Sequence, residues 1–396
     1  MSKGEKIALI ILAALNFTHI LDFMILMPLG NFLMPYFNLS TQQFSYLVSA
    51  YAISAGSSSF ISAFYVNNFD RKKILLYAYV GFLIGTLACG LAPTYVFLFL
   101  ARIVTGIFGG MISAQVLSIV ADLIPFERRG SAMGIVMAAF AFASSIGVPF
   151  SLYLANFFDW QMPFFFIATL GLIFIPLIIK FIPSLTMHIG KNELSKIDII
   201  SQIFKNKNQS LAILFSGFMM MGHFLIIPFI NPFLEFNKGY DKSFTPLVYL
   251  FGGIASLISA NLFGRLADVY GKWKIYTLCV FLCLPLIIMI TNLPSISKYL
   301  VLVIFVLWFS FATGRGVAAQ ALVSNVAPPE SRGSFQSFVS FMQQIGTGMA
   351  SLIAGWIVIK DESHKLLHYN VLGYFSIFVL LLTILIGYNL FSSKKA

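Results

Sequence analysis

The sequence predicts an all-α membrane protein, with twelve transmembrane helices arranged in two pseudo-symmetric six-helix bundles. Of the 396 residues, 59% are hydrophobic and only 10% are charged. A soluble protein of this composition would lack the polar groups needed to cover its surface. Twelve apolar runs are each long enough to cross the hydrocarbon core of a bilayer. Motifs in the first half of the chain return in the second half, which indicates two related bundles.

The first apolar run begins after Lys3 and Lys6, a start that resembles a secretory signal. Because the run continues for about 30 residues and lacks a small-x-small cleavage site, we expect it to remain as the first membrane helix. The six predicted spans of the N-terminal bundle, residues 1–182, cover 7–37, 43–66, 73–92, 95–122, 130–157 and 161–182.

The stretch 183–207, PSLTMHIGKNELSKIDIISQIFKNK, interrupts the apolar runs with six charged residues. We expect it to be an amphipathic cytoplasmic linker between the two bundles. The six predicted spans of the C-terminal bundle, residues 208–396, cover 209–236, 244–267, 274–292, 298–326, 333–359 and 369–392.

The basic residues predict the orientation of the chain. With twelve spans, both termini and the linker share one side, whose connections hold 18 of the 25 Lys and Arg residues, against 5 on the other side. Since cytoplasmic loops are enriched in Lys and Arg, we place the termini and the linker in the cytoplasm. The same distribution explains the net charge of +11 without a nucleic-acid partner. The abundance of Ile, Lys, Asn and Phe is typical of a bacterial protein, so we expect the inner membrane.

The two halves repeat at an offset of roughly 200 residues, as parallel bundles would. The segment AQVLSIVADLIPFERRG at 114–130 returns as AQALVSNVAPPESRG at 319–333. Such repeats imply a pseudo-twofold axis along the membrane normal, with a binding site between the halves.

Four motifs stand out in chain order. The loop after the eighth span follows a G-x-x-x-D-R-x-G-R-K pattern at Gly264, Asp268, Gly271 and Lys272. The corresponding loop in the first half departs from this pattern, and it holds Ala63, Asn67, Asn68, Asp70, Arg71 and Lys72 at those places.

The other three motifs lie inside spans. The fourth span reads ARIVTGIFGG, in which Arg102 and Gly106 form an R-x-x-x-G element. The fifth reads SSIGVPFSLYL, with Gly147 and Pro149 in a G-x-P element followed by Ser151. The first span contains LDFMILMPLG.

Together these motifs resemble the major facilitator superfamily over essentially the whole chain, and its twelve-helix drug–proton antiporter group in particular. The resemblance implies the superfamily's two-bundle fold, and the G-x-P element, associated with antiporters, favours export. In the first-half loop, two asparagines replace the aspartate and arginine whose ion pairs are usual in the superfamily. This weakens those interactions, and the carboxylate of Asp70 is able to compensate. Ser151 stands where a glycine is common.

The first span carries the ionisable residues that we assign to proton coupling. Asp22 lies about 15 residues into the span, roughly 22 Å along a helix, where a carboxylate costs about 2.5–3.5 kcal/mol. We predict that Asp22 binds and releases the coupled proton, that Arg102 orients it, and that His19, whose ordinary pKa is about 6.5, relays protons. The alternatives are a permanently ionised Asp22–Arg102 pair and a neutral, packed His19.

Arg315 suggests how substrate is held. It lies some 17 residues into the tenth span, beside Gly314 and Gly316, and has no evident counter-charge. We expect it to bind an anionic or carbonyl-bearing substrate, although pairing with helix-end carbonyls or a distant acid is the alternative. In the seventh span, Pro228 and Pro232 loosen the backbone. The full set of predicted substrate-binding residues is Arg315, Asn16, Asn231, His223 and Met24, with Glu235 at the outer mouth.

At the cytoplasmic face the resemblance implies an inter-helix charge network that favours the outward-facing state, whereas plain positive-inside anchoring is the alternative. Gly147 and Pro149 would allow a close helix approach and a bend, beyond generic small-residue packing. The predicted gate residues are Asp70, Arg71, Asp122, Arg129, Asp268, Gly271, Lys272 and Arg332.

We therefore expect a secondary active transporter, a proton-coupled antiporter that exports small organic or amphipathic compounds by alternating access. An importer, symporter or facilitator for a sugar, metabolite or siderophore is the alternative. A membrane enzyme or lipid flippase is less favoured, since G-x-S-x-G, H-E-x-x-H and P-loop motifs are absent from the sequence. We expect no enzyme activity, no cofactor and no metal. The expected partners are a small-molecule substrate, protons and the lipid bilayer, with the chain acting as a monomer.

Overall fold

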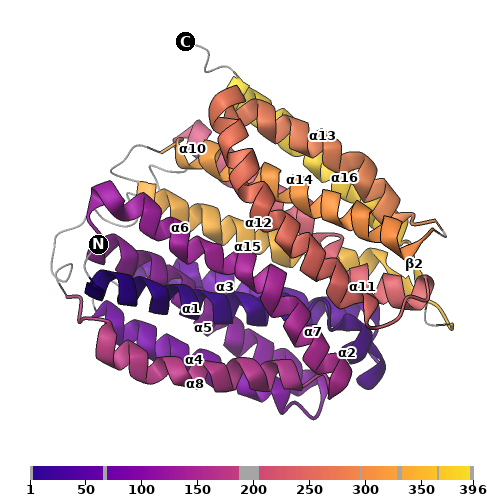
Figure 1. The fold of residues 1–396 in the computed structure, drawn as a ribbon, viewed down its shortest axis with the longest axis horizontal. Helices are drawn as coiled ribbons and strands as arrows, with labels where there is room; N and C mark the ends of the chain where they lie inside the picture. Colours follow the sequence, from indigo (N-terminus) through magenta and orange to yellow (C-terminus); the bar gives the residue numbers. More distant parts are fainter. Residues whose placement is uncertain are drawn as a thin grey trace. The chain divides into compact units, whose positions relative to one another are not determined.

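The computed structural model describes residues 3–65, 69–186, 205–294, 296–327, 332–363 and 365–392 (Figure 1). For a few of these, including Arg129 and Arg332, only the backbone is described. The chain divides into two compact units. One contains Met1–Leu29 and Ala50–Glu193, and the other contains Gly30–Ser49 and Leu194–Ala396.

The described spans of the first half are helical apart from a turn at residues 26–29, and the observed bounds follow the predicted spans within a few residues. The π-helical turn η2 joins α6 and α7 into one long segment. The helices are α1 (Lys3–Ile25), α2 (Gly30–Tyr36), α3 (Thr41–Tyr65), α4 (Arg71–Gly90), α5 (Tyr95–Leu123), α6 (Phe126–Phe142), η2 (Ala143–Gly147), α7 (Val148–Phe157) and α8 (Met162–Phe181).

The second half repeats this pattern and adds one small hairpin, in which β1 (Ile359–Lys360) pairs antiparallel with β2 (Leu366–Leu367). The helices are α10 (Lys207–Phe224), η3 (Ile227–Phe229), α11 (Ile230–Pro232), η4 (Phe233–Asn237), α12 (Phe244–Tyr270), α13 (Lys272–Thr291), α14 (Lys298–Ser324), α15 (Arg332–Ile357), α16 (Tyr369–Gly387) and η5 (Tyr388–Ser392).

The all-α membrane fold is confirmed. Ten helical segments of the described chain are long and apolar enough to cross a bilayer. The helices α3 and α15, with 25 and 26 residues, occupy the predicted second and eleventh spans and carry more polar side chains. The twelve predicted spans therefore correspond to twelve helical segments. Within the first unit α4 lies beside α8, and within the second α12 lies beside α14 (Figure 1).

The first span of each half is broken rather than continuous. The structure divides the predicted run 7–37 at a turn over residues 26–29, between α1 and α2. In the second half, α10 ends at Phe224 and the 3-10 turn η3 follows. Each break contains a proline, Pro28 or Pro228, which cannot donate a helical hydrogen bond, and each proline precedes a buried asparagine by three residues, Asn31 or Asn231.

In the first unit, glycines bring α5 against α3. A Cβ added to Gly110 would lie 2.1 Å from the carbonyl oxygen of Ala55, and one added to Gly106 would lie 2.6 Å from that of Tyr51. Any larger residue at these places would separate the helices, because backbone occupies the space. This close approach places Arg102, one turn before Gly106, next to α1 and α3.

Candidate functional site

The structure brings Asp22 and Arg102 together, as the sequence predicts. Nη1 of Arg102 lies 2.7 Å from Oδ2 of Asp22, and both side chains are fully buried. The same Nη1 donates to the backbone carbonyl of Asp22 at 3.3 Å. Since α1 and α5 meet through this pair, an ion pair links the first and fourth spans inside the membrane.

The ion pair leaves hydrogen-bonding capacity unused. Among the described residues, Oδ1 of Asp22 and both Nε and Nη2 of Arg102 lack a hydrogen-bond partner. Thr86 of α4 is close to the carboxylate without making a hydrogen bond of normal geometry. Buried polar groups are usually satisfied, so these open positions set the pair apart, and its role in proton coupling stays a prediction.

Tyr51 of α3 completes the arrangement, and the sequence analysis missed it. The Arg102 guanidinium carbon lies 4.5 Å from the centroid of the Tyr51 ring, a cation–π distance. The Tyr51 hydroxyl donates to the backbone carbonyl of His19 at 3.2 Å. One aromatic residue thus contacts the arginine of α5 and holds α1. Its only signal in the sequence is a single tyrosine within AYAISAG of the second span, which does not indicate a partner.

His19 and Asn16 also lie in the first unit, where they contact each other and α6 rather than the Asp22–Arg102 pair. The His19 Nε2 atom is 2.8 Å from Oδ1 of Asn16, and Asn16 Nδ2 donates to the carbonyl of Val136 in α6 at 3.0 Å. The bond from Asn16 to Val136 attaches α1 to α6. In the described part of the chain the His19 ring bonds Asn16 rather than Asp22, so its relay role stays a prediction. Met24, further along α1, is half-buried.

The G-x-P element supports α1 next to the ion pair. A Cβ on Gly147 would lie 2.8 Å from Cδ1 of Leu21 and 3.3 Å from the ring of Phe17. Pro149 stands at the start of α7, directly after the π-helical turn η2. A residue larger than glycine at 147 would require the side chain of Leu21, the neighbour of Asp22, to shift.

The second unit contains a different polar pair. Nη2 of Arg315 lies 3.0 Å from Nδ1 of His223, and Arg315 is only 2% exposed. The His223 ring stacks on Trp308, with centroids 5.1 Å apart. The structure therefore joins two of the predicted substrate-binding residues, from α10 and α14.

The remaining residues of the seventh span lie beyond its break. Asn231 is buried in α11. In η4, Glu235 accepts a hydrogen bond from Nδ2 of Asn31 at 2.5 Å and lies 4.0 Å from Nζ of Lys242. The sequence analysis did not identify Asn31 or Lys242 as partners of Glu235.

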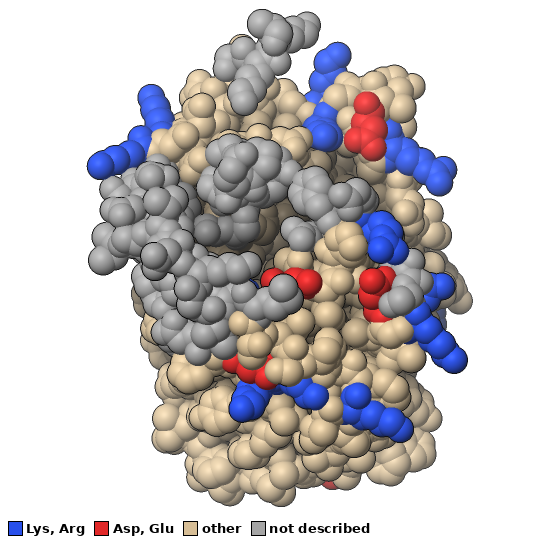
Figure 2. Space-filling model, turned by 90° about the vertical axis from the view of Figure 1, so that its left-hand side faces the viewer, with Lys and Arg blue, Asp and Glu red and all other residues tan. Residues whose placement is uncertain are grey.

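Two of the predicted gate residues are in contact in the first unit. Arg71 of α4 pairs with Asp122 of α5. The side chains of Arg129 and Arg332 lie outside the described atoms. Asp268 is exposed, and in the described part of the chain it forms no ion pair with Lys272. Figure 2 views the face near the N-terminus, on which several acidic side chains lie beside lysine and arginine side chains.

Asp70, a predicted gate residue, is held by hydrogen bonds at the start of α4, and its gate role stays a prediction. Its carboxylate caps α4 by accepting from the Lys72 amide at 3.0 Å, and it also accepts from the Leu185 amide at 3.0 Å and the Ser184 hydroxyl at 2.6 Å. Partial burial opposes ionisation, but these hydrogen bonds and the nearby Lys73 charge hold the pKa of Asp70 below its usual value. Asp70 thus ties the start of α4 to the chain that follows α8.

Gly271 separates α12 from α13 with a φ of +97°. This backbone conformation is accessible to glycine and strained for other residues. The backbone conformation therefore explains why the loop motif of the second half has a glycine at this position.

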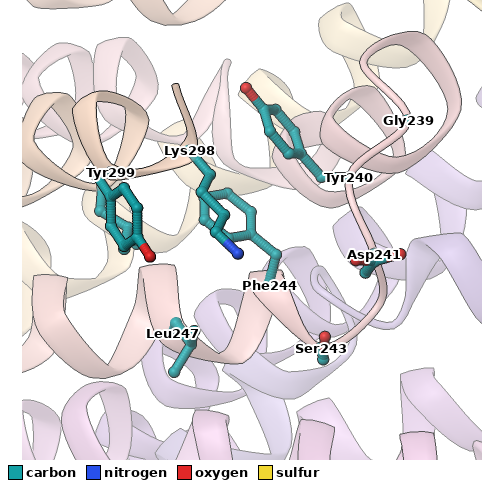
Figure 3. Close-up of a pocket in the computed structure, with 9 residues that line it drawn as sticks. Gly239, Tyr240, Asp241, Ser243, Phe244, Leu247, Lys298 and Tyr299 are labelled. Atoms are coloured by element: carbon teal, nitrogen blue, oxygen red, sulfur yellow. The ribbon is translucent and has the colours of Figure 1, made fainter. Parts of the chain in front are cut away.

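A cavity of about 290 Å³ lies between the N-terminal ends of α12 and α14 (Figure 3). It contains none of the predicted site residues, and no feature of the sequence indicated it. Its lining residues are Gly239, Tyr240, Asp241, Ser243, Phe244, Leu247, Lys298, Tyr299 and Leu302.

Long apolar helices and a buried ion pair between two of them define a polytopic membrane protein. A family model described as Major Facilitator Superfamily matches residues 12–351. The chain belongs to the major facilitator superfamily, and it is a membrane transporter and not an enzyme.

Two relatives from Bacillus subtilis (strain 168) support this assignment. The MFS-type transporter YceJ is 24% identical over 336 residues, which cover 85% of each chain. The MFS-type transporter YbcL is 27% identical over 288 residues, which cover 72% of each chain.

Solved transporter structures share the fold. A bacterial homolog of the human lysosomal transporter Spinster, inward-facing and unoccupied, has a TM-score of 0.77 at 14% identity and covers 98% of this chain and 97% of its own. The nucleoside transporter NupG gives 0.77 at 13% identity, with 97% and 100% covered. A D-xylose–proton symporter gives 0.74 at 17% identity, with 96% of each covered.

Proposed function

We propose that this transporter is a proton-coupled antiporter that exports small organic or amphipathic compounds. The observation that carries the proposal is the buried Asp22–Arg102 pair, 2.7 Å apart between α1 and α5. Protonation of Asp22 removes one charge of the pair and leaves Arg102 with the Tyr51 ring and a backbone carbonyl. Losing one partner of a buried ion pair costs about 3–5 kcal/mol. A change of that size shifts a two-state equilibrium by about two to four orders of magnitude.

The proton and the substrate would act on the same equilibrium in opposite directions. A proton entering from outside neutralises Asp22, and substrate entering from inside favours its release. Alternating access requires only that each ligand bind the two conformations with different affinities. Arg315, His223, Asn231, Asn16 and Met24 are the proposed substrate-binding residues, and Asp22, Arg102 and His19 the proposed proton-coupling residues.

Export is favoured over import by the G-x-P element, in which Gly147 packs against α1 directly before Asp22. The proposed halves are residues 1–182 and 208–396, joined by a cytoplasmic linker over 183–207. The proposed cytoplasmic gate includes the ion pair of Arg71 and Asp122. Its further proposed members are Asp70, Arg129, Asp268, Gly271, Lys272 and Arg332.

The first experiment identifies a substrate by an efflux screen across compound classes in a pump-deficient host. Purified protein in proteoliposomes is then tested with that substrate under an imposed pH gradient. Asp22→Asn should abolish pH-driven transport while membrane insertion stays normal, because an amide cannot exchange the proton. Arg102→Ala should behave similarly.

Two variants sharpen this experiment. Asp22→Glu keeps a titratable carboxyl and should retain part of the pH-driven flux. Asp159→Asn, an exposed residue between α7 and α8, is the matched control and should behave as wild type. Unchanged pH dependence in Asp22→Asn would contradict the coupling proposal, and accumulation of substrate against the predicted direction would favour the importer alternative.

A further inference from the structure

The partners of Arg315 indicate what kind of molecule this transporter carries, an inference that rests on the proposed function. We propose that Arg315 and His223 form a subsite for a carboxylate, so that the substrates are small organic carboxylates. The three following features of the second unit support this subsite: a missing counter-charge, an unfilled donor and an open neighbouring surface.

Arg315 has no negative partner among the described residues. It is 2% exposed, and no described carboxylate lies within 4.0 Å of its guanidinium. The thiols of Cys279 and Cys283 and the phenol of Tyr276 interact with its charge, and none of these groups is ordinarily charged at neutral pH. A buried arginine in mid-span therefore lacks the neutralisation that Asp22 gives to Arg102, and a bound anion would supply it.

The hydrogen bond to His223 determines the protonation of the histidine ring and leaves part of the Arg315 guanidinium without a partner. A guanidinium only donates hydrogen bonds, so Nδ1 of His223 must accept the 3.0 Å bond from Nη2. The ring is then neutral, with its proton on Nε2. Nη1 of Arg315 has no partner in the described part of the chain. The planar fork of an arginine matches the two oxygens of a carboxylate.

One side of the pair is held rigidly and the other is open. The Ser376 hydroxyl donates to the carbonyl of Gly222 at 2.5 Å, which fixes α10 next to His223, and the ring stacks on Trp308. His223 itself is only half-buried. A Cβ added to Gly316 would meet nothing within 4 Å, so the residue that follows Arg315 in α14 borders open space.

The test uses the full-length protein in lipid nanodiscs and three matched probes: benzoate, benzyl alcohol and benzylamine. Their rings are equivalent and their charges differ. Binding is measured by intrinsic tryptophan fluorescence, with Trp308→Phe identifying the signal from the subsite, and by calorimetry. We expect saturable binding of benzoate alone. Equal binding of benzylamine or benzyl alcohol would overturn the proposal.

Variants of Arg315 separate charge from geometry. Arg315→Gln should weaken benzoate binding at least tenfold, because charge-assisted hydrogen bonds are lost. Arg315→Lys keeps the charge without the fork and should weaken binding to a smaller extent. Wild-type affinity in Arg315→Lys would contradict the proposed fork, and this variant decides the matter even where Arg315→Gln fails to fold.

A chloride titration distinguishes a substrate site from an inorganic counter-ion site. Displacement of benzoate by chloride at equal or lower concentration would overturn the assignment to organic carboxylates, and resistance to chloride supports it. Because binding is measured without a pH gradient, loss of carboxylate binding and loss of proton-coupled transport are separate results. Failure of this inference is thus distinguishable from failure of the proposed function.

Discussion

Two buried arginines with different partners are the main features at the residue scale. Arg102 pairs with the carboxylate of Asp22, whereas Arg315 bonds the imidazole of His223. A proton can neutralise the first partner and thereby expose the arginine charge. In the second pair the partner is already neutral, so the arginine charge remains available for an anion. This difference between the two units is the basis of the proposed proton site and the proposed carboxylate subsite.

Asp70 gives a prediction about stability and pH. Its pKa is lowered in the folded protein, so its contribution is present above the ordinary carboxyl pKa of about 3.9 and is lost as the pH falls through the lower folded-state pKa. Asp70→Asn should reduce the melting temperature at pH 7. The difference from wild type should shrink below about pH 4, measured by thermal unfolding of the purified protein.

Asp159→Asn serves as the control for this measurement, since its side chain is exposed. A melting-temperature difference between Asp70→Asn and wild type that stayed constant from pH 7 to the acid limit would show that the ionised carboxylate contributes nothing. The same variant also tests whether Asp70 holds the chain after α8. If it does, Asp70→Asn should make the chain at Ser184 and Leu185 more accessible to proteases than in the wild type.

At the scale of helices, small residues decide how close the spans lie. Gly110 of α5 is the clearest case, since an added Cβ would lie 2.1 Å from the Ala55 carbonyl oxygen. Gly110→Ala should push α5 away from α3 and disturb the contact between Arg102 and Tyr51. We expect a loss of about 1–3 kcal/mol in stability together with reduced transport, measured by thermal unfolding and by flux.

Gly134→Ala is the matched control for Gly110→Ala. An added Cβ at Gly134 would meet nothing within 4 Å, and alanine is favoured over glycine in a helix by roughly 0.5–1 kcal/mol. The control should be neutral or slightly stabilising. Equal behaviour of the two variants would mean that the contact between α5 and α3 is not tight.

The whole molecule gives a prediction about topology. Each span reverses the side of the membrane, and the basic residues favour cytoplasmic termini. Alkaline phosphatase fused after residue 40 should therefore be active, and the same enzyme fused after residue 186 should be inactive. The opposite pattern would invert the proposed orientation and, with it, the proposed direction of proton entry.

Much of this architecture could be predicted from the sequence, because the length of an apolar run is a local property of the chain. Nearby residues alone predict the spans and the weakened helical backbone at Pro228. They also show that burying the charges of Asp22, Arg102 and Arg315 in mid-span costs free energy. The break at Pro28 was not predicted, since its run is apolar on both sides and hydropathy does not register a turn.

The partners of these residues were decided only by the tertiary structure. The Asp22–Arg102 pair was anticipated from a family pattern, but Tyr51 beneath the arginine was not. Nor was the contact of Asp70 with Ser184, more than one hundred residues away. Which side chains meet depends on how each helix is rotated and how closely it packs, and contacts such as that of Gly110 with Ala55 set both. Hydropathy carries no information about helix rotation. The sequence therefore identifies the ionisable residues that are buried in the membrane, whereas only the tertiary structure determines which side chains they contact.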